Sequence, residues 1–158
     1  MRVLFVCMDN ICRSPTAEGV FAKLLAELAP DIEVEIDSAG THAYHVGEQP
    51  DRRAQAAALQ RGVDISGLRA RKVRPSDFEY YSHILAMDED NLGILREWCP
   101  AEHRHRLRLF LDYASSSELR DIPDPYYGSA NGFEYVLDLV EDASRGLIDE
   151  LMRQARSA

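Results

Sequence analysis

Two cysteines and an arginine lie close together in the segment VCMDNICRSP, residues 6–15. Five residues separate Cys7 from Arg13, and Ser14 follows the arginine directly. A cysteine thiolate is a strong nucleophile, and an arginine can bind two phosphate oxygens side by side. We expect these residues to bind a tetrahedral dianion, with Ser14 donating a hydrogen bond to the thiolate. The alternative is that Cys7 is a buried strand residue and Arg13 a surface charge.

The elements on both sides of this segment favour the chemical interpretation. Residues 3–7 form a nearly unbroken apolar run, which is typical of a buried parallel strand. Apolar residues recur at helical spacing over residues 14–28, and we expect Ser14 to cap this helix with Pro15 at its first position. A turn from a strand to a helix N-terminus directs backbone N–H groups and positive potential into one hollow. A thiol at the floor of such a hollow loses its proton easily.

The rest of the chain alternates between strands and helices. We expect further strands at residues 32–37, 82–87 and 107–111, further helices at residues 51–61, 88–98 and 131–155, and a long loop at residues 112–130. Such alternation predicts an α/β fold with a parallel sheet. Ligands bind at the carboxyl ends of the strands in these sheets, and Cys7 ends the first strand.

The composition limits the classes of protein and partner. With 158 residues, 46% of them hydrophobic, the chain is long enough for one domain, which we expect to span residues 1–158. A net charge of -9 disfavours nucleic acid and anionic membranes as partners, and no apolar run approaches the ~20 residues of a membrane span. Three cysteines and the absence of a secretory pattern predict a cytoplasmic protein with reduced thiols. The five histidines are scattered, so no metal site is expected.

Four segments resemble motifs of the low-molecular-weight protein tyrosine phosphatases. The segment VCMDNICRSPTAE is similar to the family's V-C-x-G-N-I-C-R-S-P-x-A-E, and residues 38–41 match its S-A-G-T. Residues 87–91 match M-D-x-x-N, and residues 124–127 match D-P-Y-Y. The motifs occur in the family's order over nearly the whole chain. The resemblance implies a single-domain α/β fold, with a four-stranded parallel sheet flanked by helices and a phosphate-binding loop after the first strand.

The resemblance also implies the hydrolysis of protein phosphotyrosine, with a role for each of three residues. Cys7 would attack phosphorus and become a phosphocysteine. Arg13 and the amides of residues 8–13 would bind the phosphate oxygens. Asp124 would act first as general acid and then as general base. Asp121 is a nearby rival for this last role, but it lacks the Pro-Tyr-Tyr context.

Other residues would surround or support these three. The resemblance assigns substrate binding to Met8, Asp9, Asn10, Ile11, Cys12, Ser14, Tyr44 and Tyr126. Asn10 would tie a strained turn to Ser38, and Ser14 would support the same turn. Cys12 would form a reversible disulfide with Cys7 on oxidation, or else simply pack the turn as a small apolar residue. Tyr44 and Tyr126 would form aromatic walls, although Tyr44 is equally well explained as an exposed loop residue.

The implied partners are phosphotyrosine proteins or peptides, and a tyrosine kinase would be the counterpart enzyme. The chemistry requires no cofactor and no metal. Seven basic residues lie between positions 52 and 74 against one acidic residue, Asp64. This basic tract would either attract acidic phosphopeptides or form an ordinary solvated helix face.

Two positions depart from the family pattern, and three alternative functions stay open. Asp9 stands where the family usually has glycine, and residues 67–71 lack the histidine that often precedes Ala-Arg. A carboxylate at position 9 would weaken dianion binding or shift the pH dependence unless it points outward. A thioredoxin-coupled arsenate reductase would need two more cysteines on a mobile segment, and a protein-arginine phosphatase would carry threonine in place of Ile11. A phosphopeptide-binding module without turnover is the third alternative.

Overall fold

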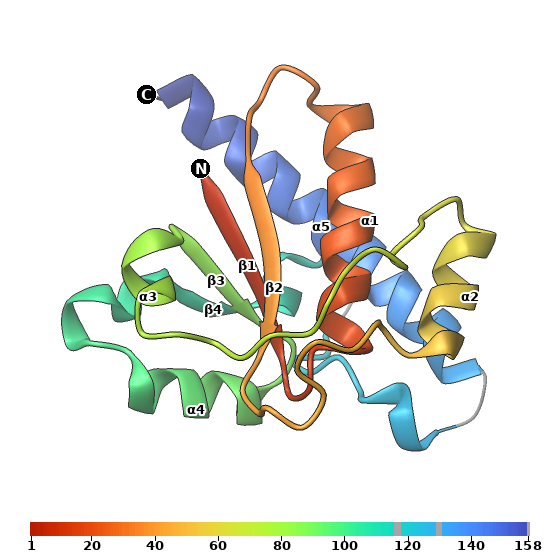
Figure 1. Ribbon diagram of the computed structural model, residues 1–158. Coiled ribbons are helices and arrows are strands. Elements are labelled where there is room, and N and C mark those ends of the chain that lie inside the picture. The colour runs from red at the N-terminus through yellow and green to blue at the C-terminus, as the bar shows by residue number, and fades with distance from the viewer. Residues whose placement is uncertain (116–117, 129–130, 158) are drawn as a thin grey trace.

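A four-stranded parallel sheet forms the centre of the computed structural model, which describes residues 1–115, 118–128 and 131–157. The strands, in chain order, are β1 (Arg2–Cys7), β2 (Glu35–Gly40), β3 (His83–Ala86) and β4 (Leu107–Leu109). Their spatial order is β2-β1-β3-β4, and every neighbouring pair is parallel (Figure 1). The predicted α/β fold with a four-stranded parallel sheet is therefore confirmed.

Helices cover both faces of this sheet. The α-helices are α1 (Arg13–Leu28), α2 (Arg52–Gln60), α3 (Asp77–Tyr80), α4 (Glu89–Trp98) and α5 (Asn131–Ser157). Short 3-10 turns follow at Ala101–Arg106, Phe110–Tyr113 and Pro125–Tyr127. No helix in the described part of the chain is both long and apolar enough to cross a membrane.

Alternation along β1 divides the apolar side chains into two cores. Val3 and Phe5 are fully buried on the face covered by α1 and α5, whereas Leu4 and Val6 face the core beneath α3 and α4. Figure 1 shows α1 and α5 on one side of the strands and α3 and α4 on the other. Because β1 is buried on both faces, its sequence is a continuous apolar run.

The second strand lies three residues later than predicted. The expected strand at residues 32–37 rested on alternation, but β2 pairs with β1 from Glu35, opposite Arg2, to Gly40, opposite Cys7. The segment Ser38–Ala39–Gly40 lies beyond the predicted strand, yet these small residues are buried and continue the pairing up to the nucleophile candidate. Small side chains give no alternating signal, so the pattern failed where the strand reaches the site.

The first helix also begins differently from the prediction. It starts at Arg13, and Cys12 occupies the N-cap position without a side-chain capping bond. Ser14 is therefore the second helical residue and not the cap, and Pro15 is the third. The reason is that the Ser14 hydroxyl is used elsewhere, next to the sulfur of Cys7 and the amide of Asn10.

The remaining boundaries agree closely with expectation, except at the fourth strand. Asp51 caps α2, and Gly62 follows that helix with a φ of 81°, which favours glycine. The predicted strand at 107–111 ends at Leu109, because the next residues turn into a 3-10 helix. Part of the expected loop at 112–130 lies outside the described residues.

Candidate active site

The segment from Cys7 to Arg13, here called the phosphate loop, joins the end of β1 to the start of α1. Cys7 is 3% exposed, and its Sγ accepts a hydrogen bond from the backbone N–H of Asn10 at 3.3 Å. The hydroxyl of Ser14 lies 3.0 Å from the same sulfur. A thiolate can only accept hydrogen bonds, so Ser14 must donate when Cys7 is ionised. The N-terminus of α1 adds positive potential at this point.

Asn10 holds the phosphate loop from behind. Its φ is 59°, and it is the only non-glycine residue with positive φ in the described chain. Its Nδ2 donates to Ser14 Oγ at 2.8 Å and to Ser38 Oγ at 3.0 Å. Its Oδ1 accepts from the backbone N–H of Arg71 at 3.0 Å. The contact to Ser38 that the resemblance implied is present, and Arg71 supports the turn in a chain that lacks the family's histidine.

Glu18 extends this hydrogen-bonded chain into α1. Ser38 Oγ donates to Glu18 Oε1 at 2.7 Å. The pKa of Glu18 is raised from 4.5 to about 7, chiefly by burial; the charge of Asp37 contributes to the increase, whereas the hydrogen bond from Ser38 opposes it. A series of hydrogen bonds thus runs from the partly buried carboxyl group of Glu18 through Ser38, Asn10 and Ser14 to the sulfur of Cys7.

Arg13 is buried and held by acidic and carbonyl oxygens. Its Nη1 donates to Asp88 Oδ2 at 2.6 Å and to the carbonyl of Ile122 at 2.9 Å, while Nη2 lies 3.7 Å from Asp124 Oδ2. Burial opposes the charge of Arg13, but Cys7 and Asp88 outweigh it and raise the pKa of the guanidinium above its ordinary value. Asp88 also caps α4 by accepting from the N–H of Asn91, which fixes the carboxylate that orients the arginine.

The structure separates the two aspartates that competed for the acid role. Asp124 lines the pocket next to the phosphate loop, and its Oδ1 accepts from the backbone N–H of Tyr126 at 3.0 Å. Asp121 instead accepts a hydrogen bond from the backbone N–H of Glu89, at the start of α4. The geometry therefore gives Asp121 a structural partner and leaves Asp124 in the pocket.

One pocket collects most of the predicted site residues. It is lined by Cys7, Asp9, Ile11, Cys12, Arg13, Asp124 and Tyr126. Asn10, Ser14 and Ser38 are buried behind it. The loop backbone at Met8 is fixed by its carbonyl, which accepts from the N–H of His42 at 2.9 Å.

Tyr44 does not line this pocket, so of its two interpretations the structure favours the exposed loop residue over the aromatic wall. Its side chain is 76% exposed and stacks on His42, with the ring centroids 5.5 Å apart. Together with Lys72 and Trp98 it borders a separate hollow. The ring of His42 is itself fixed by a hydrogen bond of 2.8 Å between its Nδ1 and Thr41 Oγ1.

Asp9, the position where the family usually has glycine, is one of the residues that line the pocket. Its Oδ1 is buried and makes no hydrogen bond to any described residue. Because Asn10 alone has positive φ among the described non-glycine residues, the backbone at Asp9 does not need the glycine that the family usually has. The backbone conformation therefore does not explain why this chain has an acidic residue at the lining of the pocket.

The other two cysteines differ from Cys7. Cys12 is 5% exposed and lines the same pocket, and burial, followed by the charge of Asp51, raises its pKa far above the ordinary value. It therefore stays protonated and cannot compete as a nucleophile. Cys99 belongs to the core on the opposite face of the sheet, where its Sγ donates to the carbonyl of Pro100. All three cysteines are free thiols.

Sequence reasoning assigned no role to Asp88, Glu18 or Gly40. Each lies inside a quoted motif: M-D-x-x-N, C-R-S-P-x-A-E and S-A-G-T respectively. Gly40 packs against the phosphate loop so closely that an added Cβ would lie 2.7 Å from the carbonyl oxygen of Met8. The motifs were the signal that could have found these residues, but spacing alone does not say what each one contacts.

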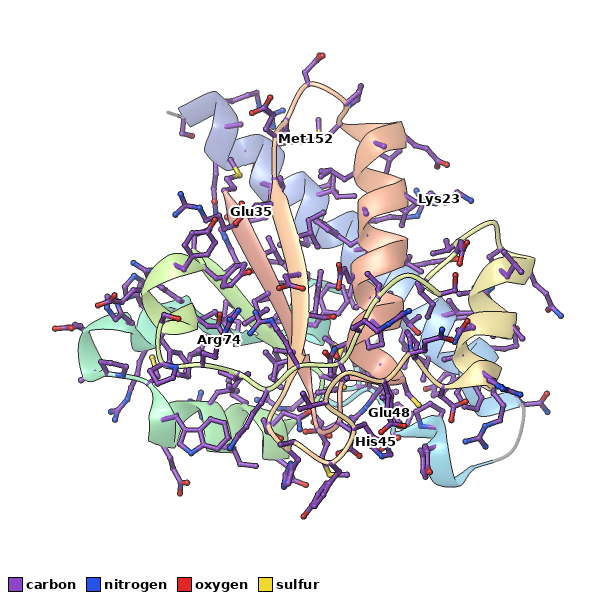
Figure 2. The ribbon with its side chains drawn as sticks, viewed as in Figure 1. Lys23, Glu35, His45, Glu48, Arg74 and Met152 are labelled. Carbon is purple, nitrogen blue, oxygen red and sulfur yellow. The ribbon has the colours of Figure 1, made fainter. Side chains whose placement is uncertain are left out.

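Two further hollows put the pocket in context. The largest, about 980 Å³, lies at the opposite ends of the strands, near Met1, Glu35 and His105, and no cysteine lines it. A second, of about 340 Å³, shares Ile11 and Tyr126 with the site pocket. Figure 2 shows His45 and Glu48 on the loop before α2, where they pair at 2.8 Å and line this adjoining hollow. Among these hollows, the smaller pocket is the one that brings Cys7, Arg13 and Asp124 together.

The chain matches the model of one protein family, described as low molecular weight phosphotyrosine protein phosphatase, over residues 2–157. A low molecular weight protein-tyrosine-phosphatase of Bacillus subtilis is 36% identical over 152 residues, which cover 96% of each chain. The human low molecular weight phosphotyrosine protein phosphatase is 36% identical over 154 residues, which cover 94% of each. A crystal structure of a protein tyrosine phosphatase from Entamoeba histolytica has a TM-score of 0.94 at 38% identity, covering 98% of this chain and 99% of that one.

Proposed function

We propose, because this chain belongs to the low molecular weight phosphotyrosine protein phosphatase family, that it hydrolyses protein phosphotyrosine through a phosphocysteine on Cys7. One observation supports the assignment to particular residues: Cys7 and Arg13, at the two ends of the phosphate loop, line the same pocket as Asp124, which comes from a distant part of the chain. Arg13 is the phosphate clamp and Asp124 the general acid and base. The substrates are phosphotyrosine proteins or peptides.

In the first step the Cys7 thiolate attacks phosphorus, and the bond from phosphorus to the tyrosine oxygen breaks. Asp124 gives its proton to that oxygen, because tyrosinate is a poor leaving group. Arg13 and the N–H groups of the phosphate loop hold the three equatorial oxygens, whose charge must be stabilised in the transition state. The buried partners of Arg13 keep its fork oriented before substrate arrives.

In the second step water attacks the phosphocysteine, and inorganic phosphate is released. Asp124, now a carboxylate, takes the proton from this water. The sulfur leaves as a thiolate, and the hydroxyl of Ser14 at 3.0 Å donates a hydrogen bond that stabilises it. The Nδ2 of Asn10 donates to the oxygen of the same hydroxyl, which leaves the hydroxyl proton free to be donated to the sulfur.

The alternatives are less well supported. An arsenate reductase of the thioredoxin-coupled kind needs a relay of further cysteines, and Cys99 is buried in the core on the other face of the sheet. Ile11 lines the pocket where an arginine phosphatase would carry threonine. The binding module without turnover has one observation in its favour, the carboxylate of Asp9 inside the anion pocket.

The test is hydrolysis of p-nitrophenyl phosphate from pH 4 to 8 by wild type, Cys7→Ser, Asp124→Ala and Asp121→Ala. We expect no turnover in Cys7→Ser and a loss of about 10²-fold or more in kcat for Asp124→Ala, the usual contribution of a general acid. Asp121→Ala is the matched control and should keep its rate, because Asp121 accepts from the backbone N–H of Glu89 and does not line the pocket. A phosphotyrosine peptide should be hydrolysed and a phosphoserine peptide should not.

Two results would overturn the proposal. Folded wild type that binds the phosphotyrosine peptide without turnover, as tightly as Cys7→Ser does, would favour the binding module. A rate loss in Asp121→Ala equal to that in Asp124→Ala would remove the assignment of the general acid.

A further inference from the structure

A pair of charged residues at the start of α2 connects the phosphate loop to the segment that carries Asp124. The backbone N–H of Asp51 donates to the carbonyl of Ile11, inside the phosphate loop, at 2.8 Å. The carboxylate of Asp51 then holds the side chain of Arg53 through two bonds, from Nε at 3.2 Å and from Nη2 at 3.1 Å. This fork fixes the plane of the guanidinium relative to the loop.

The same guanidinium reaches the segment after Asp124. Nη2 of Arg53 donates to the carbonyl of Tyr126 at 3.0 Å, and its central carbon lies 5.5 Å from the centre of the Tyr126 ring. The ring of Phe133, at the start of α5, lies 4.9 Å from it. The N–H of Tyr126 in turn donates to Asp124 Oδ1. Arg53 thus fixes the backbone of Tyr126, and Tyr126 in turn fixes the carboxylate of Asp124.

Asp124 is consequently held on both sides. On the N-terminal side, the carbonyl of Ile122 accepts from Arg13, and its N–H donates to the carbonyl of Met87. On the C-terminal side, the carbonyl of Tyr126 accepts from Arg53. An exposed ion pair contributes little to stability, so the consequence of this arrangement lies in geometry. General acid catalysis needs the proton within hydrogen-bond reach of the leaving oxygen.

We propose that Arg53, oriented by Asp51, is a positioning residue that aligns Asp124 with the leaving oxygen. The inference rests on the proposed function, since it assumes that Asp124 is the general acid. The inference also gives two neighbouring residues of the basic tract, Arg52 and Arg53, different roles. Arg53 acts within the site, whereas Arg52 is exposed and makes no hydrogen bond or ion pair with the described residues. A variant with both arginines changed would therefore not separate the alignment of Asp124 by Arg53 from any attraction of acidic peptides by Arg52.

The test measures kcat/KM for aryl phosphates whose leaving-group pKa rises from that of 4-nitrophenol to that of phenol. The variants are Arg53→Ala, Arg53→Lys, Arg52→Ala, Asp124→Ala and the double variant Asp124→Ala/Arg53→Ala. Arg53→Ala should lower kcat/KM about tenfold for phenyl phosphate and less for p-nitrophenyl phosphate, because a misplaced acid matters most for poor leaving groups. Arg53→Lys should show an intermediate loss, since lysine keeps the charge without the fork.

A role in general folding would give a different pattern. If Arg53 acts through Asp124, its removal from the Asp124→Ala variant should cause no further loss, and Arg52→Ala should stay within twofold of wild type. The inference is wrong if the Arg53→Ala loss is equal across the series, persists in the Asp124→Ala background, or is matched by Arg52→Ala. If wild type shows no turnover, the proposed function itself is wrong. If the loss of kcat/KM depends on the leaving group in Asp124→Ala but not in Arg53→Ala, this inference alone is wrong. Thermal unfolding of each variant and its alkylation at Cys7 report whether the fold and phosphate loop are intact.

Discussion

Among single residues, Asp9 is the one whose chemistry conflicts with its surroundings. Asp9 lines the same pocket as Cys7, and one oxygen of its carboxylate is buried without a hydrogen-bond partner among the described residues. A phosphate monoester is mostly dianionic above about pH 6, so the two negative charges repel each other when substrate binds. The same repulsion would favour release of inorganic phosphate after the second step.

We therefore expect Asp9→Asn to bind phosphate more tightly. At pH 7 its KM for a phosphotyrosine peptide should fall, and kcat/KM should rise about tenfold, equivalent to ~1.4 kcal/mol of relieved repulsion. Inhibition by inorganic phosphate should strengthen in parallel. Asp90→Asn is the control, because Asp90 is an exposed residue at the start of α4 and its change removes the same charge elsewhere. A fall in kcat/KM for Asp9→Asn would mean that the carboxyl group helps to bind the substrate.

The sequence predicted single residues well where the chemistry was local. Cys7, Arg13 and Ser14 lie within eight consecutive positions, so spacing and residue type were enough to bring them together. Asp88 is 75 positions from Arg13 and binds it at 2.6 Å, and no spacing rule connects them. The side chain of Tyr44 could not be placed either, because its stacking on His42 depends on a loop conformation.

Among the elements, β2 and the phosphate loop depend on each other. Strand β2 ends at Gly40, where an added Cβ would lie 2.7 Å from the carbonyl oxygen of Met8 and 3.1 Å from the carbonyl carbon of Asp9. Both are backbone atoms of the phosphate loop, so neither can move aside without moving the loop. The end of the strand thus sets the position of the loop that binds phosphate.

Substitution of Gly40 should therefore damage activity more than stability. We expect Gly40→Ala to lower kcat/KM at least tenfold and to lower the free energy of unfolding by about 1–3 kcal/mol, as overpacking usually does. Gly67→Ala is the matched control, because a Cβ there meets nothing within 4 Å. Steady-state kinetics and urea denaturation measure the two effects separately. Equal activity of the two variants would show that the loop can shift without consequence.

Elements were predictable to the extent that side-chain patterns define them. Asp51, Gly62 and Asp88 are strong boundary signals, and the helices that they begin or follow lie within one or two residues of expectation. The pattern did not predict the end of β2, because its residues are small enough to contact the phosphate loop closely and therefore show no alternation of apolar and polar side chains. Local pattern therefore weakens where an element is shaped by the site.

At the scale of the whole molecule, the support of the active site places an acidic group inside the fold. Glu18 lies on α1, between Ser38 and Asp37 of β2, and Arg71 faces it from the loop after α2. Arg71 is already engaged with Asp37 and Asp77. Burial is the largest cause of the raised pKa of Glu18, about 7 against an ordinary 4.5. The folded protein therefore holds this proton more tightly than the unfolded chain does.

This difference makes the stability of the protein depend on pH. Below about pH 4.5 both states carry the proton, and the stabilising contribution is fully present; it is lost as pH rises to about 7, where the folded state must bury a charge. The shift corresponds to roughly 3 kcal/mol.

Glu18→Gln keeps an oxygen that can accept from Ser38 but cannot ionise. Relative to wild type, its free energy of unfolding in urea should therefore increase by up to this amount between pH 5 and pH 8. Glu27→Gln, an exposed change on the same helix, should show no such increase, and a Glu18→Gln difference that stays constant with pH would mean that Glu18 ionises normally in the folded state.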